Sequence, residues 1–475
     1  MVFMHKRLLA YQLPLILGLA AAVRLAVLLA FPQVFAFEQT GAVHGSDAYD
    51  AYAQNLLATG VYGRTPGVPD AAIPPLYSYA LAAVYDLFGR GHVQAGLFHI
   101  ALDLFSIACL FNIGKRLMEN QTVGALASLF YALYPYLIFQ NLTLIDTPFF
   151  MALLYAFLLL VIQLRERPVF DRAAWGLAAL AGLVLGASLL TRPITPPLAL
   201  LVAVWFLFRL DLRQTIIRLL PVAAVGALVL APWIARNTAV YHAFVPMTTT
   251  SGANFWQGNS RYTVPVFRAG YDVQWTAPEL ETPDPYSREA DAERFALGFR
   301  YLRENPEKIP ELLWVKFLVY WSLDIAPRYN PLPGERIGLD ENGEFVIRRV
   351  DADGQLLTYG ENDPVNAYDE PLFDVLGRLV HRFYWGGLFL LGLAGGLLAL
   401  RRWRETALLW FAQISMTLVY LAFHPSTRYR VPTDPLWFLF PAYALVMLWG
   451  WWRGRRQNLA PAAENAPSHQ RQDGA

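Results

Sequence analysis

The sequence contains a single cysteine, Cys109, and few charged residues. One cysteine cannot form a disulfide within the chain, and it cannot supply a thiolate zinc site, which needs several such ligands. Charged residues make up 16% of the sequence, whereas soluble domains contain roughly 25%. The formal net charge is only +1, so a basic surface for nucleic acid is not expected either.

Hydrophobic residues are abundant instead: they make up 56% of the sequence, and long apolar runs recur along the chain. A helix needs about 20 such residues to cross a bilayer. The runs therefore predict an all-α polytopic membrane protein with about ten transmembrane helices. The predicted spans are residues 9–31, 93–113, 122–140, 147–164, 174–190, 195–210, 216–235, 378–399, 406–423 and 433–452.

Clusters of Lys and Arg predict the orientation, because short cytoplasmic loops collect them. Those at residues 5–7, 115–116, 165–172, 209–218, 401–404 and 453–456 fall on one side if the spans alternate, which puts both termini in the cytoplasm. The first run could instead be a secretory signal, because basic residues precede it and "VFAFE" offers a small-residue cleavage site. It is longer than the roughly 7–15 residues of a signal core, so we expect an uncleaved anchor.

Two long segments then lie outside the membrane, at about residues 32–92 and 237–377, and they are the expected place for chemistry. The predicted domains are an N-terminal transmembrane module at 1–236 that includes the outer loop 32–92, an extracytoplasmic segment at 237–377, C-terminal transmembrane helices at 378–456 and a cytoplasmic tail at 457–475. The composition of the tail, rich in Ala, Asn, Gln and Pro, predicts disorder.

The first outer loop contains "HGSDAYDAYAQNLLATG", in which Ser46 can start a helix and Gly60 can end one. Apolar residues recur at helical spacing and leave Asp47 and Asp50 on the polar side. We expect an amphipathic helix on the membrane surface, then a Pro/Gly-rich link and a second short helix, "LYSYALAAVYDLF". Later, "READAERFALGFRYLRENPEK" predicts a helix, "ELLWVKFLVYWSLDIAP" an interfacial segment and "GEFVIRRVDADGQLLTY" a small hairpin.

Four arginines stand on the outer side, where short loops ordinarily avoid basic residues. They are Arg192 in "LLTRPITPP", Arg236 in "APWIARN", and Arg428 and Arg430 in "HPSTRYRVP", which also contains His424 and Tyr429. Contact with lipid headgroups explains any one of them equally well. Together they predict a bound anion at headgroup depth, and a lipid-linked phosphate fits because guanidinium groups bind phosphate oxygens bidentately.

Charged and polar residues within the predicted spans are destabilising unless they are paired. Arg24, His99 and Asp103 are of this kind. A pair between Arg24 and Asp103 that holds two helices together is the favoured interpretation, and a proton relay is the alternative.

A metal site is weakly supported. His44, Asp47, Asp50 and His424 all lie on the outer side, but no compact spacing of ligands defines a site. A divalent metal is therefore a minor hypothesis, no residue is assigned as a metal ligand, and no cofactor is assigned.

These stretches together resemble the bacterial membrane glycosyltransferases of the GT-C fold, in particular the family 39-like enzymes related to protein O-mannosyltransferases and the lipid A aminoarabinose transferase. The similarity is densest at "SDAYDAYAQNLLATGVYG" with "PPLYSY", at "LLTRPITPP", at "PWIARNTAVYHAFVPMTTTSGANFWQGN" and at "HPSTRYRVPTDPLWFLF". The lipid A enzymes carry a lysine before the Pro-Pro of the first loop, where this chain has Ile73.

The resemblance implies a cell-envelope enzyme of the bacterial inner membrane, with its active site facing the periplasm. Its donor would be a sugar on a polyprenyl phosphate, its acceptor a lipid, glycan or protein, and membrane lipids would be further partners. Asp47 would be the general base in an inverting transfer, supported by Asp50. An N-cap also explains Asp47, and a solvated helix face also explains Asp50.

The remaining site residues follow from the same resemblance and from the charge pattern. Arg192, Arg236, Arg428, Arg430 and Tyr429 are the expected contacts of the donor phosphate. Candidate substrate contacts are Tyr49, Asp146, Asn254, Trp256, Asn259 and His424, and Asp146 is an alternative second carboxylate. Loop packing explains Asn254, Trp256 and Asn259 equally well.

A transporter or lipid flippase is the main alternative from another class, and a polysaccharide polymerase is a second enzymatic one. Transporters typically have broken helices at the membrane midplane and repeated halves, and neither pattern is apparent in the sequence. The polar residues gather at the outer surface instead, which favours the glycosyltransferase.

Overall fold

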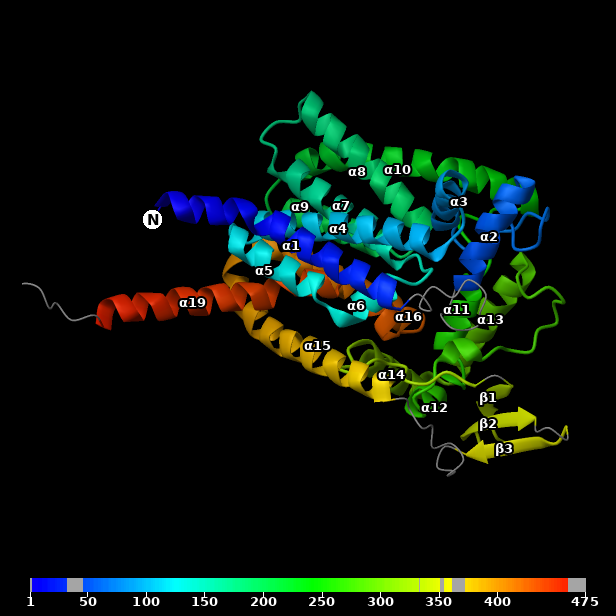
Figure 1. Cartoon of the computed structure of the whole chain (residues 1–475). Helices are drawn as coiled ribbons and strands as arrows, with labels where there is room; N and C mark the ends of the chain where they lie inside the picture. The colour runs from blue at the N-terminus through cyan, green and yellow to red at the C-terminus, as the bar shows by residue number, and fades with distance from the viewer. Residues whose placement is uncertain (1, 32–45, 333, 351–353, 361–371, 460–475) are drawn as a thin grey trace, which may run out of the picture.

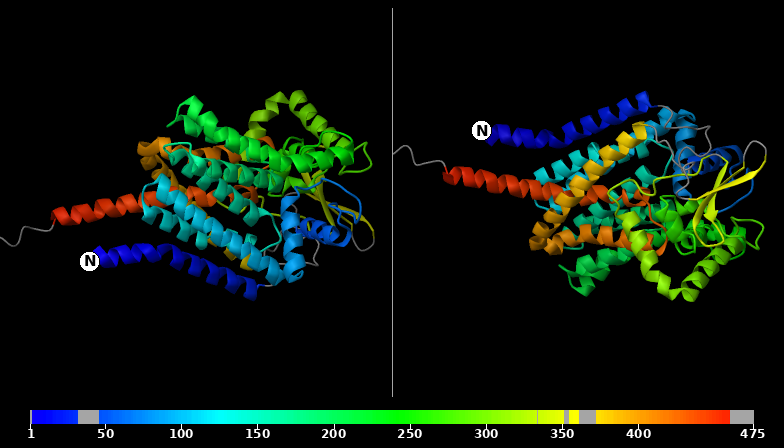
Figure 2. Two further views of the ribbon diagram at one scale, coloured as in Figure 1. Left: turned by 90° about the horizontal axis from the view of Figure 1, so that it is seen from above. Right: turned by 90° about the horizontal axis from the view of Figure 1, so that it is seen from below.

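The computed structural model describes residues 2–31, 46–332, 334–350, 354–360 and 372–459. Its long helices run side by side along the molecule, and most of the short helices gather with the sheet at one end (Figure 1). We call this the loop end, formed by residues 46–88, 242–332, 334–350 and 354–360. Two further views show the N-terminal and C-terminal helices reaching away from it (Figure 2).

Seven helical segments of the described residues are long and apolar enough to cross a membrane. They are Tyr11–Ala30 within α1 (Val2–Ala30), α4 (His92–Leu117), α7 (Thr147–Glu166), α8 (Arg172–Thr191), α10 (Leu212–Tyr241), Val375–Ala422 and Asp434–Arg453. The sixth contains most of α15 (Leu372–Ala399), together with η5 (Leu400–Arg402) and α16 (Trp403–Ala422). The last contains α18 (Asp434–Trp437) and most of α19 (Leu439–Leu459). The predicted all-α polytopic membrane protein is confirmed, whereas the count of ten spans stays a prediction.

Two of the predicted spans are not single long helices. Residues 122–140 form α5 (Gln121–Ala132) and α6 (Pro135–Gln140), and residues 195–210 contain the 12-residue α9 (Pro196–Leu207). Proline cannot donate a helical hydrogen bond and disfavours helix at the preceding residue, which explains the break before Pro135. Hydropathy alone did not detect this interruption because the residues around it are apolar.

The first outer loop folds, as predicted, into two helices joined by a Pro/Gly-rich link. These are α2 (Ser46–Thr59) and α3 (Leu76–Phe88). The Tyr77 hydroxyl on α3 lies 2.8 Å from Nε2 of His99 on α4, so this buried histidine is paired with the loop.

The second long segment at the loop end contains short helices followed by a sheet. The helices are α11 (Ser251–Gly258), α12 (Thr263–Arg268), η2 (Val273–Trp275), α13 (Arg288–Glu304), η3 (Pro306–Lys308) and α14 (Ile309–Tyr320). With 12 residues, α14 is shorter than a membrane span needs, in keeping with the predicted interfacial position. A four-residue helix, α17 (Thr427–Arg430), precedes α18.

The sheet has three antiparallel strands in the order β1 (Glu335–Leu339), β2 (Phe345–Val350) and β3 (Leu356–Gly360). The predicted hairpin is the β2–β3 pair, with Ile347 opposite Tyr359. Alternate side chains of a strand point to one face, and here Ile337, Phe345 and Ile347 are buried in one cluster with residues of α12 and α14.

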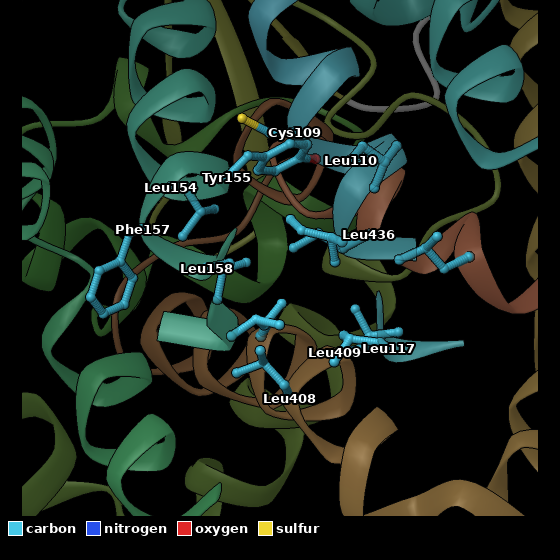
Figure 3. Close-up of a cluster of buried hydrophobic side chains, with 14 of the residues drawn as sticks. Cys109, Leu110, Leu117, Leu154, Tyr155, Phe157, Leu158, Leu408, Leu409 and Leu436 are labelled. Atoms are coloured by element: carbon cyan, nitrogen blue, oxygen red, sulfur yellow. The ribbon is translucent and has the colours of Figure 1, made fainter. Parts of the chain in front are cut away.

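The largest core joins the long helices through buried apolar side chains. Leu110, Leu154, Leu158 and Leu409 belong to it, and each is at most 1% exposed (Figure 3). Because lipid tails are as apolar as leucine, helices in membranes associate by close packing rather than by the hydrophobic effect. On α8, Gly182 permits such an approach, since a Cβ there would lie 2.5 Å from a backbone carbonyl of α10.

The predicted pair of Arg24 and Asp103 is confirmed. Nε of Arg24 lies 2.5 Å from Oδ2 of Asp103, and both side chains are at most 1% exposed. Arg24 also donates to the carbonyl of Ala132 at 3.0 Å. Asp103 accepts from the Tyr131 hydroxyl at 2.8 Å and from Nδ2 of Asn141 at 2.6 Å. The pair therefore ties α1 to α4 and α5.

Candidate functional site

Two cavities lie at the loop end, and both are lined by Arg428 and Tyr429. The larger, cavity A, has a volume of about 490 Å³. Its other walls come from α2, from the segments 191–197 and 246–254, from Asp146, and from the end of α16 with the loop after it. The smaller, cavity B, has a volume of about 370 Å³ and is walled by residues of α6, the loop after it, and the segments 272–274 and 325–330.

Proline-rich turns bring the first cationic group to cavity A. Helix α8 ends at Thr191, where Arg192 adopts an extended backbone, and α9 begins at the paired prolines Pro196 and Pro197. Asp146 directly precedes α7, which begins at Thr147 and Pro148, and its side chain makes no capping hydrogen bond. These turns place the side chains of Arg192 and Asp146 opposite one another.

Arg192 and Asp146 form a buried, bidentate ion pair. Nε of Arg192 lies 2.7 Å from Oδ2 of Asp146, and Nη2 lies 2.5 Å from Oδ1. Nη2 also donates to the Thr147 hydroxyl at 2.8 Å. Within the described part of the chain, the remaining nitrogen, Nη1, is buried without a hydrogen-bond partner. The pair thus holds the guanidinium in place and leaves one donor for a ligand.

The charges around this pair shift its pKa values. Burial alone would raise the pKa of Asp146, but the charge of Arg192 and its hydrogen bonds bring that pKa below its usual value. Tyr49 of α2 lies within hydrogen-bonding reach of Asp146, and burial followed by that carboxylate raises the pKa of its phenol. At neutral pH, Asp146 is therefore ionised and Tyr49 is a neutral hydrogen-bond donor.

Arg428 supplies a second cation to the same wall. Its Nε is buried and has no hydrogen-bond partner among the described residues. The neighbouring Tyr429 ring stacks on Tyr420, with centroids 4.8 Å apart and planes 8° apart. His424 meets the edge of Tyr429, and its Nδ1 lies 3.3 Å from the carbonyl of Asn254. Burial, the largest influence, lowers the pKa of His424 and favours its neutral form.

Arg236 and Arg430, predicted to bind the same phosphate, line neither cavity. Arg236 donates to two backbone carbonyls of the link after α2, at 2.6 Å each. Arg430 is fully buried, where its Nε lies 3.1 Å from Asp434 and its Nη1 donates to the carbonyls of Tyr320 and Ser322. These contacts hold the loop end together, so the expected group of four arginines is reduced to Arg192 and Arg428.

Helix α2 contains two aspartates, Asp47 and Asp50, and the structure describes the side chain of Asp50 alone. Asp47 lies in the first turn of α2, but its side chain is outside the described residues. Asp50 is 5% exposed, so the expected solvated helix face is wrong at this position. It accepts from Arg90 at 2.7 and 2.9 Å, from Tyr85 at 2.9 Å and from Gln54 at 2.8 Å. These contacts anchor α2 to α3 and to the start of α4.

Of the remaining candidates, Asn254 lines cavity A, whereas Trp256 and Asn259 line neither cavity. Trp256 packs beside Tyr262. Asn259 donates to two carbonyls at 2.8 Å and accepts from Nζ of Lys316 at 3.1 Å. Lys316 also donates to the carbonyl of Phe423 at 3.2 Å, and burial lowers its pKa to about 7. Loop packing is thus the better explanation of Trp256 and Asn259.

Sequence reasoning missed Tyr420 in cavity A, Asp272 in cavity B and the buried Lys316. Tyr420 lies in an apolar run, Asp272 in the unpatterned stretch "AGYDVQW" and Lys316 in an apolar helix. Lys316 could have been found, because a single lysine within the apolar stretch "LLWVKFLVY" indicates a buried amine.

No group of three or more His, Cys, Asp or Glu side chains in the described residues could hold a metal ion. His44 and the side chain of Asp47 lie outside the described residues, so the minor metal hypothesis stays a prediction.

Comparison with known proteins supports the resemblance read from the sequence. Residues 72–235 match the family model described as dolichyl-phosphate-mannose-protein mannosyltransferase. This stretch contains Pro74, Asp146 and Arg192, three residues of the wall of cavity A. No curated protein matches the sequence significantly.

Two similar solved structures are of the Archaeoglobus fulgidus oligosaccharyltransferase. The AglB complex with an inhibitory peptide and a dolichol-phosphate has a TM-score of 0.53 and 14% identity, over 96% of this chain and 53% of that chain. The apo form has a TM-score of 0.51 and 13% identity, over the same shares of 96% and 53%. This chain therefore spans about half the length of those proteins.

ArnT from Cupriavidus metallidurans in the apo state is also similar, with a TM-score of 0.40 and 14% identity over 90% of this chain and 77% of that chain. That TM-score is too low to support an argument. The family-model match and the oligosaccharyltransferase structures together confirm the GT-C fold and the resemblance to its glycosyltransferases.

Proposed function

We propose that this protein transfers a sugar from a polyprenyl-phosphate donor to an acceptor on the extracytoplasmic side of a bacterial inner membrane. One observation carries the proposal: Arg192 and Arg428 both line cavity A and both hold a buried nitrogen that has no partner in the described structure. Two guanidinium groups at the edge of a membrane protein suit one phosphate or phosphodiester group.

The walls of cavity A suit the lipid part of such a donor. Apart from the polar groups named above, they consist mainly of prolines and of apolar residues such as Ile194 and Val419. The exposed residues of the lining include Pro196 and Pro246, and the adjacent Phe244 is 73% exposed. An isoprenoid chain could enter from the bilayer at this point while its phosphate reaches the two arginines.

The reaction would be a single displacement. The oxygen of an acceptor hydroxyl forms a bond to the anomeric carbon, and the bond from that carbon to the phosphate oxygen breaks. The electron pair leaves with the polyprenyl phosphate, whose growing negative charge Arg192 and Arg428 stabilise, and Tyr429 flanks them. Attack opposite the leaving group inverts the anomeric centre.

Asp47 is the proposed general base that accepts the proton of the acceptor hydroxyl. One feature supports this choice besides the resemblance. The other two candidate carboxylates, Asp50 and Asp146, are held by Arg90 and Arg192. Asp50 then has the supporting role of anchoring α2.

The topology is part of the proposal. The basic clusters put both termini in the cytoplasm and the loop end in the periplasm. A polyprenyl-phosphate donor presents its head group at the membrane surface, which agrees with a site formed where long helices meet the loop end. In the AglB structure a dolichol-phosphate and an inhibitory peptide are bound to that protein, which makes a lipid-phosphate donor reasonable here.

The test uses the full chain in lipid nanodiscs with membrane lipid extract containing a labelled polyprenyl-phosphate sugar. We expect Asp47→Asn to lower label transfer by about 100-fold or more, as for other lost general bases, while undecaprenyl phosphate still binds. Asp86→Asn, which changes an exposed acid on α3 of the same outer loop, is the matched control and should transfer at the parent rate.

Three results would count against the proposal. Equal transfer by Asp47→Asn and the parent removes Asp47 as the base. Binding of undecaprenyl phosphate without any transfer, but with movement of the lipid across the membrane, identifies a flippase. Label found only in a lengthening chain of one repeating sugar identifies a polysaccharide polymerase.

A further inference from the structure

We propose that cavity B is the acceptor site, and that it takes the hydroxyl group of a neutral, water-borne carbohydrate rather than a membrane lipid. The inference rests on the proposed function and adds the class of acceptor. It is carried by the position of cavity B, by the polarity of its exposed lining and by the chemistry of its walls.

The two cavities are neighbours separated by a thin partition. Arg428 and Tyr429 line both of them. Ile145 lines cavity B, and the next residue, Asp146, lines cavity A. Similarly, Ser426 lines cavity B, whereas His424, two residues earlier, lines cavity A. A ligand in cavity B therefore approaches a donor phosphate in cavity A at Arg428, where the glycosidic bond would be exchanged.

The exposed lining of cavity B is polar. It includes Arg328 and Asn330, which belong to the loop between α14 and the sheet. The exposed lining of cavity A includes two prolines, Pro196 and Pro246. A polar mouth suits a substrate that arrives from water, so we assign the aqueous substrate to cavity B.

The walls of cavity B carry hydrogen-bonding groups suited to hydroxyls. Asp272 is 8% exposed, and its carboxylate accepts from the backbone N–H and from Nε2 of Gln274 at 3.1 and 2.9 Å. No ion pair in the described residues includes Asp272, so its oxygens can accept further hydroxyl donors. Thr143 and the ring of Tyr136 lie in the same lining. A sugar offers both hydroxyls and an apolar ring face to such a wall.

The size and charge of cavity B narrow the ligand further. A volume of about 370 Å³ lies near the lower end of the roughly 300–1,000 Å³ seen for small-ligand sites, so it suits one sugar unit better than an extended peptide. The charged residues of the lining are Asp272, Arg328 and Arg428. With Arg428 assigned to the donor phosphate, the carboxylate of Asp272 and the guanidinium of Arg328 balance one another, which favours a neutral ligand. A neutral saccharide satisfies both constraints.

The experiment measures ligand binding, not transfer, on the full chain in nanodiscs loaded with undecaprenyl phosphate. Saturation-transfer NMR is recorded with methyl glycosides of neutral hexoses and pentoses, methyl N-acetylhexosaminides, a capped Ser/Thr peptide and glycerol phosphate. We expect at least one neutral glycoside to bind, and Asp272→Asn to weaken it by about tenfold or more, because a hydrogen bond to a charged acceptor is lost.

Two comparisons make the result specific. Glu307→Gln changes an exposed acid of the same segment and should leave glycoside binding unchanged. Asn330→Trp narrows the mouth of cavity B at an exposed position that accepts a hydrogen bond from Trp275, and it should also weaken glycoside binding. Undecaprenyl phosphate should bind both cavity B variants with the affinity of the parent protein.

The inference is overturned if no neutral glycoside binds, if only the peptide or glycerol phosphate binds, or if both cavity B variants bind the glycoside like the parent. Weaker binding of undecaprenyl phosphate to Asp272→Asn would assign cavity B to the donor and overturn it too. Failure of the proposed function is a separate result, namely absence of undecaprenyl phosphate binding in the parent protein.

Discussion

Two buried arginine–aspartate pairs, one among the long helices and one beside cavity A, share the same shortest nitrogen–oxygen distance but differ in their surroundings. The nitrogen–oxygen distance is 2.5 Å in both Arg24–Asp103 and Arg192–Asp146. The first pair is at most 1% exposed and holds helices together. The second lines cavity A, where Arg428 adds another cation. A buried ion pair is therefore weak evidence of function by itself, and the adjoining cavity makes the difference.

The largest effect should come from breaking the pair among the long helices. Asp103→Ala leaves Arg24 as an uncompensated buried charge, so we expect the free energy of unfolding to fall by about 3–5 kcal/mol. The double variant Arg24→Met with Asp103→Leu should recover most of this loss, because an apolar pair of similar volume replaces both charges. Denaturant unfolding in mixed micelles measures both values. A single variant as stable as the parent would contradict the structural role.

The next effect separates two arginines that are neighbours in the sequence. Arg428→Gln should weaken undecaprenyl phosphate binding by about 10–100-fold, the effect of losing a hydrogen bond to a charged group, and leave the melting temperature unchanged. Arg430→Gln should lower the melting temperature, because it leaves the fully buried Asp434 without its ion-pair partner. Native mass spectrometry and thermal unfolding measure the two properties.

The exposed Arg261, at the loop end and outside both cavities, provides the control for this prediction. Arg261→Gln should change neither the affinity nor the melting temperature. If Arg428→Gln and Arg430→Gln weaken phosphate binding equally at matched stability, the distinction between a cavity arginine and a packing arginine is wrong.

The smallest effect concerns Lys316, a buried amine that has no acidic partner among the described residues and therefore differs from both pairs. Its pKa is about 7 in the folded protein, against 10.5 ordinarily, so the unfolded chain binds more protons between these values. Stability should therefore rise with pH from about 7 to about 10, by at most about 1.4 kcal/mol per pH unit from this group. Below pH 7 both states are protonated and the slope disappears.

Unfolding of the parent and of Lys316→Met between pH 6 and 9 tests this assignment. Above pH 7, the free energy of unfolding of Lys316→Met should rise less steeply with pH than that of the parent, by an amount that corresponds to at most one proton. This difference in slope is expected whether the variant is more or less stable than the parent at any single pH. Identical slopes in the two proteins would show that Lys316 does not titrate in this range.

Several elements could be predicted from local sequence because their causes are local. The Pro/Gly-rich link separates α2 from α3, and β2 and β3 lie on either side of the Asp-Gly sequence, at the predicted places. The break before Pro135 was missed although proline is its local cause, because a hydropathy average does not register a single residue. The side chain of Asp47 lies outside the described residues, so its role stays a prediction.

The site itself was predicted in part. Arg192, Arg428, Tyr429, Tyr49, Asp146, Asn254 and His424 line cavity A as a group drawn from distant segments. Arg430 was grouped with Arg428 because both lie in "HPSTRYRVP". Residues two apart on a helical turn point in nearly opposite directions, so the sequence could not show which of them faces a cavity.

The sequence by itself determined the membrane class, most of the long helices and the pairing of Arg24 with Asp103. The membrane class and the long helices follow from runs of consecutive apolar residues, which favour transfer into hydrocarbon. The pairing follows because a charged side chain within the hydrocarbon region needs a partner of opposite charge. Only the tertiary structure decided which outer charges share a cavity, that Asp50 is buried against Arg90, and that Arg428 stands between two cavities. Such outcomes depend on packing between segments far apart in the chain, which no local pattern of residues encodes.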